Sequence, residues 1–469
     1  MKAHYPMILA SLLLAACSSL SSTPYHQPVL NLPAHWQAES LQDLGKAQGL
    51  WWQQFGDERL NRLVQQVLAR NNDLTAAAIK VHKAVLQVGL ADDNLVPGVS
   101  LSESSSISRS LASAGNMQPQ QPLQQSTGAG QSHGLTASIS YEVDLWGRLS
   151  QLSHAQHWEA LASEQDRQAS RLSLIGNTIK LYWKQAWLQQ RLHMAQDSLE
   201  YQQRVLQLVL VKQQAGSAAQ LDVLSARQSL ASQQASLYDY QQQLTETRNA
   251  LAILLDGPPD EAFPLAGQLP ERDLPDVPAG LPVQLLSRRP DLRAAELRLR
   301  ETLANGDATR AAYYPDFSLT GSLGTSSTRL AQVLSNPLAT LGAGLTLPFV
   351  QWRQMRLNTQ ISATDYQLAV VNFRQALYQA LADVQNALSA HQQEQLQGQQ
   401  LTMAAQLAGQ SEQLYRLRYQ AGSATLKDWL DAQESQRQSA AALLENHYNR
   451  LVNQVTLYQA LGGEMHAAQ

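Results

Sequence analysis

Apolar residues recur every seven positions along two stretches of the chain. They stand at Val223, Leu230, Leu237, Leu244 and Leu251, at Leu174, Leu181 and Leu188, and at Leu192, Leu199 and Leu206. A seven-residue apolar period is typical of helices that pack as left-handed coiled coils. Because 149–214 and 355–420 contain no proline, each predicts one uninterrupted helix of roughly 100 Å at 1.5 Å per residue. A helix of that length needs lateral neighbours to be stable.

Four shorter stretches alternate between apolar and polar residues, at 99–107, 135–143, 317–323 and 341–349. Strict alternation predicts β-strands with one apolar face. About ten residues are enough for a tilted strand to cross a bilayer. A small soluble hairpin packed on helices would show the same alternation, so both interpretations are open at this point. Further helices are expected over 57–93, 217–255, 282–312 and 424–461.

The chain carries nearly the same sequence twice. Residues 68–77 reappear at 286–295, and Ala215-Gly216-Ser217 reappears as Ala421-Gly422-Ser423. We therefore predict a first repeat at 51–257, a linker at 258–280, a second repeat at 281–463 and a tail at 464–469. A duplicated unit is typical of a wall, ring or tube rather than of a catalytic centre.

The repeated Ala-Gly-Ser turns predict two helical hairpins with exposed tips. Gly216 and Gly422 are expected to end the long helices in a left-handed conformation. Ser217 and Ser423 are expected to cap the helices that follow. Ser217 and Gln220 also fit the spacing of a capping box, which the second turn lacks because position 426 is Leu426.

The N-terminus has the pattern of a secreted lipoprotein. An apolar run after Lys2 ends in Leu14-Ala15-Ala16-Cys17, which resembles the bacterial lipobox. It predicts a signal peptide at 1–16, a lipidated tether at 17–50, and N-palmitoyl and S-diacylglycerol groups on Cys17. An ordinary signal peptide with an incidental cysteine is the alternative. No stretch of 18 apolar residues follows Cys17, so a membrane-crossing mature chain would cross as β-strands.

Composition and motifs argue against several classes of function. The net charge is −4 and 15% of residues are charged, so there is no basic excess to hold nucleic acid. The sequence has no His-Glu-x-x-His motif for zinc, no glycine-rich phosphate loop after a strand, and no Gly-x-Ser-x-Gly elbow. We expect neither an enzyme nor a bound metal or cofactor.

Several motifs follow one another in a set order along the chain. They are Pro24-Tyr25, Pro28, Pro33 and Trp36 after Cys17, residues 51–57 with Leu60 and Leu63, residues 141–148, residues 289–292, Tyr314-Pro315, and residues 419–423 with 430–433. Together they resemble the outer-membrane efflux protein family, the TolC-like channels, and its OprM- or NodT-like lipoprotein branch. One departure is the glycine-free segment 348–354, where family members usually carry a glycine-containing turn, so the geometry of this corner is not predicted.

The resemblance implies a mainly α fold with a membrane β-barrel. Four strands cannot close a barrel, whereas a homotrimer supplies twelve strands, four per chain. In the family this barrel continues as a long periplasmic α-helical barrel. The implied protein is a lipid-anchored, membrane-spanning channel of the cell outer membrane, the exit duct of a tripartite efflux system. It would passively conduct drugs or other small molecules from a periplasmic adaptor and an inner-membrane pump, of the resistance-nodulation-division type.

The resemblance also indicates which residues serve the channel. Inward carboxylates near the second tip would narrow the periplasmic mouth, and the candidates are Asp428 and Asp431. A solvated helix face, with Lys427 paired to Asp431, is the alternative. Gly216, Ser217, Gly422 and Ser423 would dock the adaptor. A periplasmic coiled-coil adaptor or a structural lipoprotein remains a different interpretation of the whole chain. The sequence does not predict the cargo.

Overall fold

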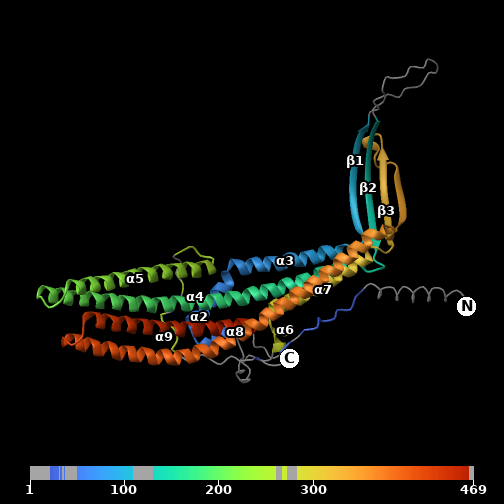
Figure 1. The fold of residues 1–469 in the computed structure, drawn as a ribbon. Helices are drawn as coiled ribbons and strands as arrows, with labels where there is room; N and C mark the ends of the chain where they lie inside the picture. The colour runs from blue at the N-terminus through green and yellow to red at the C-terminus, as the bar shows by residue number, and fades with distance from the viewer. Residues whose placement is uncertain are drawn as a thin grey trace, which may run out of the picture. The chain divides into compact units, whose positions relative to one another are not determined.

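The computed structural model of the chain describes residues 22–30, 32–33, 36, 50–108, 130–259, 263, 267–271 and 282–463. Long helices and a four-stranded sheet make up these residues (Figure 1). They divide into two compact units, and each unit draws on both sequence repeats. The sheet unit comprises 1–28, 82–162 and 296–372, and the hairpin unit comprises 29–81, 163–295 and 373–469. The predicted signal peptide, Cys17 and the tail 464–469 lie outside the described residues.

The sheet is antiparallel throughout, and its strands follow the order of the chain. The strands are β1 (Gly98–Ser108), β2 (Gly130–Val143), β3 (Asp316–Ser327) and β4 (Pro337–Thr346). All four predicted strands are therefore present. A short 3-10 helix (Leu330–Gln332) lies between β3 and β4.

The register separates the two faces of the sheet by polarity. One cross-strand row joins Val99, Ile139, Gly321 and Leu341, and the next joins Leu101, Ala137, Leu323 and Ala339. The alternate row on the other face joins Ser100, Ser138, Ser322 and Thr340, and the hydroxyl oxygens of Ser100 and Ser138 lie 2.7 Å apart. Because side chains alternate between faces along a strand, one face is mainly apolar, with Glu103 opposite Leu135 as an exception, and the other is lined mainly by hydroxyl groups.

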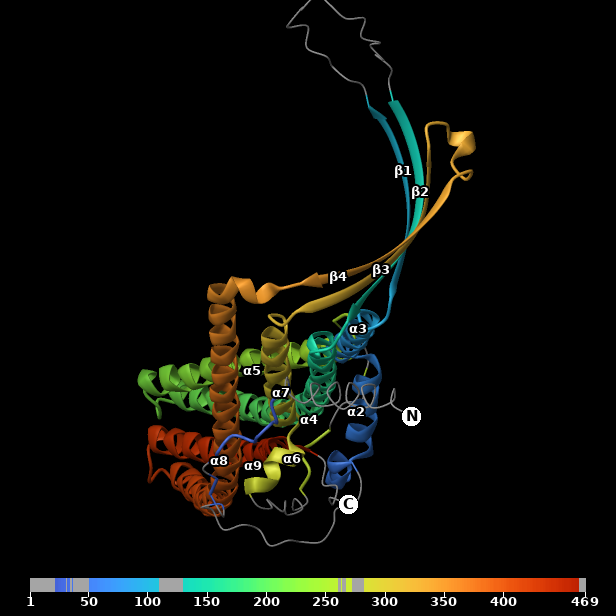
Figure 2. The ribbon, with the colours of Figure 1, turned by 90° about the vertical axis from the view of Figure 1, so that its right-hand side faces the viewer.

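Four helices continue the strand order within the sheet unit. The parts of α3 (Asn72–Asp93), α4 (Arg148–Gln214), α7 (Pro290–Ala311) and α8 (Trp352–Gln420) that belong to this unit lie side by side in that order (Figure 2). Ser153 on α4 donates a hydrogen bond to Asp92 on α3. Arg298 on α7 pairs with Glu159 on α4, and Asn358 on α8 donates to the Tyr313 hydroxyl just after α7.

Helix α3 has an unusually apolar and exposed surface. By length and composition alone it could cross a membrane, and it is the one helix among the described residues that meets those criteria. Yet 6% of its most apolar 18-residue window is buried in the chain, and Lys80 and Lys83 stand in its middle. These two charges and the exposure suit a surface covered by another protein better than a span through lipid.

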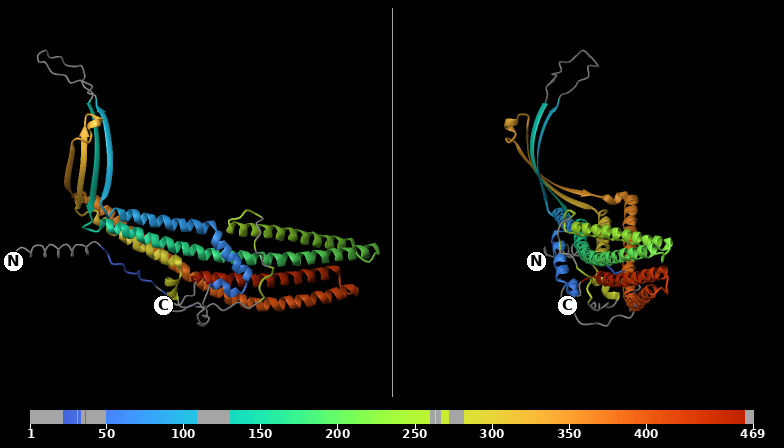
Figure 3. Two further views of the ribbon diagram at one scale, coloured as in Figure 1. Left: turned by 180° about the vertical axis from the view of Figure 1, so that it is seen from behind. Right: turned by 90° about the vertical axis from the view of Figure 1, so that its left-hand side faces the viewer.

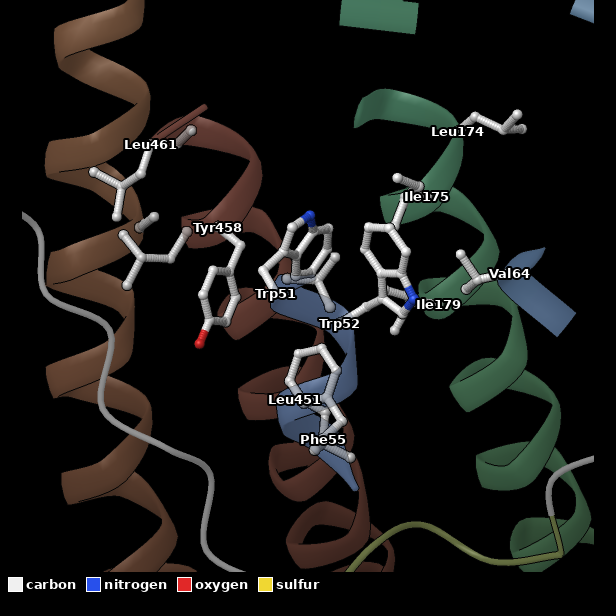
Figure 4. Packing of buried hydrophobic residues seen from close by; sticks show 14 of the residues in the cluster. Trp51, Trp52, Phe55, Val64, Leu174, Ile175, Ile179, Leu451, Tyr458 and Leu461 are labelled. Carbon is white, nitrogen blue, oxygen red and sulfur yellow. The ribbon is translucent and has the colours of Figure 1, made fainter. Parts of the chain in front are cut away.

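The hairpin unit contains two long helical hairpins and a dense aromatic core. Its further helices are α2 (Glu58–Arg70), α5 (Gln220–Leu254), α6 (Leu285–Arg288) and α9 (Leu426–Ala460). Trp51 and Phe55, from a 3-10 turn at Trp51–Phe55, pack against Tyr458 of α9 (Figure 4). Phe55 also meets the Trp183 ring of α4 edge-on. The ring of Trp51 stacks on Tyr458 at 5.0 Å between centroids. The predicted seven-residue seam of α5 is at least partly buried along its length, and Val223, Leu237, Leu244 and Leu251 are buried.

The predicted single helix over 57–93 is wrong, because it breaks at Asn71. This residue has extended backbone angles, and its side-chain oxygen accepts a hydrogen bond from the Leu74 backbone N–H. Its amide nitrogen donates to the carbonyl oxygen of Leu254 at 3.0 Å. The side chain thus caps α3 and ties the break to the end of α5.

Two further boundaries differ from the prediction. The helix expected over 282–312 is divided, because Arg289 precedes Pro290 and takes extended angles, so α7 begins at the proline. The fourth strand ends at Thr346, before Leu347 and Phe349, which were expected in the alternating stretch. Pro348 there starts a 3-10 turn (Pro348–Gln351) that leads into α8.

Candidate functional site

At the first tip, Gly216 turns the chain between α4 and α5. Its φ of +74° is left-handed, and the Ser217 backbone N–H reaches back to the Lys212 carbonyl at 2.8 Å. The Ser217 hydroxyl donates to the same carbonyl. Ser217 therefore closes α4, and its predicted role as cap of the next helix and member of a capping box with Gln220 is wrong. The Asp222 carboxylate instead accepts from the Ala219 N–H at 2.9 Å, where α5 begins.

The second tip repeats this backbone with a stronger cap. Gly422 has a φ of +75°, and both the N–H and the hydroxyl of Ser423 donate to the Arg418 carbonyl. The predicted cap at Ser423 is wrong, because α9 starts three residues later. Thr425 and Asp428 form a reciprocal capping box, in which Thr425 Oγ1 accepts from the Asp428 N–H and the Asp428 carboxylate accepts from the Thr425 N–H at 2.9 Å.

Of the two gate candidates, Asp428 lies on the first turn of α9 and Asp431 on the second, and both are exposed. Hydrogen bonds from Thr425 lower the pKa of Asp428 below its ordinary value. Asp431 forms the predicted ion pair with Lys427 one turn away, and this carboxylate raises the pKa of Lys427. The side chains of Lys427 and Asp431 are 78% and 65% exposed, so the pair is screened by water. The four predicted docking residues, Gly216, Ser217, Gly422 and Ser423, are exposed as well.

The two tips share a hydrophobic cluster that the sequence did not reveal. Trp429 of α9 stacks on Tyr419 of α8 at 5.1 Å between ring centroids and meets the Tyr201 ring of α4 edge-on. Lys212 of α4 lies 3.9 Å above the centre of the Tyr419 ring, in a cation–π contact. We call this the tip cluster; its members are Val205, Val209, Val223 and Ala226 of the first hairpin and Tyr419, Leu426, Trp429 and Leu430 of the second.

A buried carboxylate links the two hairpins beside this cluster. Glu412 of α8 is 6% exposed and accepts hydrogen bonds from the Tyr201 hydroxyl at 3.2 Å and from the Trp429 indole N–H at 3.0 Å. Burial, together with this carboxylate, raises the pKa of Tyr201 to about 12. Nearby, the side-chain amides of Gln202 and Gln433 join the hairpins at 3.2 Å. The tips are therefore held together by polar as well as apolar contacts.

The polar groups at the tips are arranged to hold the two hairpins together. Within the part of the chain that the structure describes, no group of three or more His, Cys, Asp or Glu side chains could hold a metal ion. Glu412 and Trp429, which are buried, and the half-buried Tyr201 satisfy one another's hydrogen bonds. Groups so paired hold two helices in one arrangement, and separating them exposes all three to water.

Comparison with known proteins identifies the family. A model of the outer membrane efflux protein family matches residues 63–257 and 281–463. The pyoverdine export outer membrane protein OpmQ of Pseudomonas putida is 33% identical over 468 residues, which cover 98% of this chain and 97% of that protein. The cation efflux system protein CusC of Escherichia coli is 30% identical over 97% of each chain.

Solved structures share the fold over nearly the whole chain. The outer-membrane channel OprN matches with a TM-score of 0.81 and 28% identity, over 95% of this chain and 99% of that one. The open state of the MtrE outer membrane channel of Neisseria gonorrhoeae matches with a TM-score of 0.82 and 29% identity, over 94% and 98%.

These likenesses confirm the predicted fold class for the single chain, mainly α with four long strands and a repeated architecture. They also confirm the predicted function as an efflux channel of the outer membrane. Lipidation at Cys17, the gate at Asp428 and Asp431, and docking at the tips stay predictions. The chain belongs to the outer membrane efflux protein family.

Proposed function

We propose that three copies of this chain form one closed channel, the exit duct of a tripartite efflux system. The duct conducts small molecules passively and makes or breaks no bonds. A periplasmic adaptor docks at the tips around Gly216, Ser217, Gly422 and Ser423, and an inner-membrane pump of the resistance-nodulation-division type supplies the cargo. Acyl groups on Cys17, which lies outside the described residues, anchor the chain in the same membrane that its strands cross.

The observation that carries this proposal is the open edge on each side of the sheet. Among the described residues, β1 pairs with β2 alone and β4 with β3 alone. Unpaired backbone groups cannot face lipid, so both edges need a partner strand. Pairing β1 of one copy with β4 of the next is a head-to-tail contact, which closes into a ring when the rotation fits. The family resemblance puts that ring at three copies.

The helices beside these edges support the same assembly. Within the sheet unit, α3 exposes Val85, Leu86 and Leu90, while α8 at the opposite side exposes Leu357, Ile361, Leu368 and Val371. Exposed apolar stripes on both flanks suit contact with a second copy on each side. A neighbouring chain would also cover the apolar surface of α3.

The two faces of the sheet support its place in a membrane. The apolar face, with Val99, Leu101 and Leu341 exposed, suits contact with lipid. The face with Ser100, Ser138 and Ser322 suits a water-filled interior. Strands with one lipid face and one hydrated face are the arrangement that a channel wall requires.

We assign no particular cargo to the duct, because the relatives are named for the export of different molecules. One relative is a pyoverdine export protein, a second belongs to a cation efflux system, and a third is a toluene efflux pump protein. One fold thus serves chemically different cargo in those proteins, which agrees with selection by the pump rather than by the duct.

Assembly and conductance are tested together with the purified, processed full-length protein. We expect a heat-sensitive trimer on gels and single-channel currents in planar bilayers. Ile361→Asp puts a charge on the exposed stripe of α8 and should abolish both, while Ile361→Leu keeps the apolar surface and should keep both. A water-soluble monomer without channel activity would refute the proposal.

The gate assignment needs its own test, because Asp428 also caps α9. Asn keeps an oxygen that can accept from Thr425 but removes the charge. We expect Asp428→Asn combined with Asp431→Asn to raise single-channel conductance. The control is Asp222→Asn, which removes the capping carboxylate of the first tip. Unchanged conductance in the double variant would exclude these carboxylates from the gate.

A further inference from the structure

The residues that follow the predicted lipid site are bound to the helices of the sheet unit. We call residues 22–28 the strap (Figure 3, dark blue). The backbone N–H of Thr23 donates to Asp307 of α7 at 2.7 Å, and its hydroxyl donates to the other carboxylate oxygen at 2.8 Å. Asp307 is 2% exposed. Arg310 also contacts Thr23 and Asp307. The strap is therefore held by a buried carboxylate that accepts two hydrogen bonds from Thr23.

A second contact fixes the strap about two turns closer to the start of α7. The Arg300 guanidinium lies 4.6 Å from the centre of the Tyr25 ring and 5.3 Å from that of Trp158 on α4. Burial raises the pKa of Tyr25 to about 12, with Glu296 adding to the effect. Because Arg300 and Asp307 are seven residues apart, they lie on one face of α7. The strap therefore covers that face of the helix layer.

The opposite face of α7 is polar and carries its own charges. Arg298 stands two residues before Arg300, about 200° around the helix. Its guanidinium pairs with Glu159 of α4 at 3.2 Å. Glu301 lies beside this pair, and burial together with the Glu159 carboxylate raises the pKa of Glu301. Thr302, Asn305 and Thr309 continue the same side of α7 at helical spacing.

The strap decides which face of this layer can line a pore. Cys17 is six residues before Thr23, which allows a separation of at most about 20 Å at 3.3–3.6 Å per residue. An acyl group on Cys17 must enter lipid outside the channel wall. A strap on the inner face would have to pass back through the wall within those six residues, so the strap face is the outer one.

We propose that Glu159, Arg298 and Glu301 line the pore and set its preference between cations and anions. The assignment rests on the proposed lipid-anchored channel. Each copy contributes two carboxylates and one guanidinium, which leaves one net negative charge per chain in a ring around the path. Charged rings of this kind bias permeation through the field that they focus in the lumen.

Reversal potentials in a salt gradient across a planar bilayer test the assignment. Arg298→Gln should increase the cation-to-anion permeability ratio, and Glu301→Gln should decrease it. The matched control is Glu296→Gln, which removes the same charge five residues away on the strap side of α7. It should leave the ratio unchanged. Equal ratios in Arg298→Gln, Glu301→Gln and the unaltered protein would overturn the assignment.

Thiol labelling gives an independent readout of the same face. Cys17 is the single cysteine of the sequence and has no free thiol once acylated. A cationic methanethiosulfonate reagent should lower the current of Thr302→Cys in discrete steps. It should not affect His154→Cys, an exposed position one turn from Trp158 on the strap side of α4. Block at His154→Cys instead would reverse the two faces. Absence of pores from the unaltered protein would overturn the proposed function itself.

Discussion

The first hairpin tip exposes leucines at positions where the second tip exposes charge or buries its side chains. Leu221 and Leu224 are 71% and 53% exposed on α5. Their counterparts at an offset of 206 are Lys427, which is exposed, and Leu430, which is 8% exposed in the tip cluster. The backbone turns are nearly the same, with a left-handed glycine in each.

The two repeats share the backbone geometry of the turn but differ in the side chains around it. Asp222 and Asp428 cap the two helices in the same way, so the geometry of the turn is kept. The side chains around the turn have diverged. The first tip offers an apolar outer surface that suits a docking partner. The second tip turns its apolar residues toward the first hairpin and presents Lys427, Asp428 and Asp431 to water.

The largest expected effect comes from Trp429, the central ring of the tip cluster. Trp429→Ala should destabilise the closed arrangement of the tips by about 4 kcal/mol, because it leaves a cavity and frees Glu412 and Tyr201. Val223→Ala, in the first hairpin, should cost roughly 2 kcal/mol. Hydrogen exchange of the backbone amides near 205–209 and 426–430 measures the local opening free energy. Equal costs for the two variants would show that the second hairpin does not dominate the cluster.

The next largest effect is expected when equivalent leucines of the two repeats, Leu430 and Leu224, are each truncated to alanine. Leu430→Ala should destabilise the tips by about 3 kcal/mol, since a buried leucine is truncated. Leu224→Ala should change the opening free energy by no more than about 0.5 kcal/mol, because the side chain faces water. If an adaptor binds the first tip through its apolar surface, Leu224→Ala should still weaken adaptor binding. Binding that survives in Leu224→Ala and fails in Leu430→Ala would locate docking at the second tip.

The contrast between the tips also shows what the sequence could predict. Proline-free stretches and the glycines at 216 and 422 gave the long helices and their turns, because these features act locally. Thr425 and Asp428 have capping-box spacing, so the cap of α9, two residues beyond Ser423, could have been predicted from the sequence. The role of Glu412 could not have been predicted, because its partner Tyr201 stands 211 positions earlier and nothing in the polar stretch of α8 distinguishes Glu412 from its neighbours. The break at Asn71 likewise depends on a carbonyl 183 residues away.

A smaller effect is expected at Glu412, which connects the hairpins. Glu412→Ala leaves the Tyr201 hydroxyl and the Trp429 indole N–H without an acceptor and should cost roughly 2 kcal/mol. Glu412→Gln keeps one side-chain oxygen and should cost less. Hydrogen exchange at the two tips again supplies the opening free energy. If both variants lost the same amount, the negative charge rather than the hydrogen bonds would hold the hairpins.

The smallest expected effect is a weakening of tip closure at high pH, as Tyr201 ionises. Its pKa in the closed tip is about 12, raised by burial and by Glu412, against about 10 for a tyrosine in water. Below pH 10 the hydroxyl is protonated in both the closed and the open tip, and its contribution to closure is complete. As the pH rises from 10 toward 12 the open form ionises first, so closure weakens over that interval. Absorbance of tyrosinate, taken as the difference between the unaltered protein and Tyr201→Phe, should therefore show a step near pH 12. Glu412→Gln should move that step to lower pH. A step near pH 10 in the unaltered protein would mean that Tyr201 is not held against Glu412 in solution.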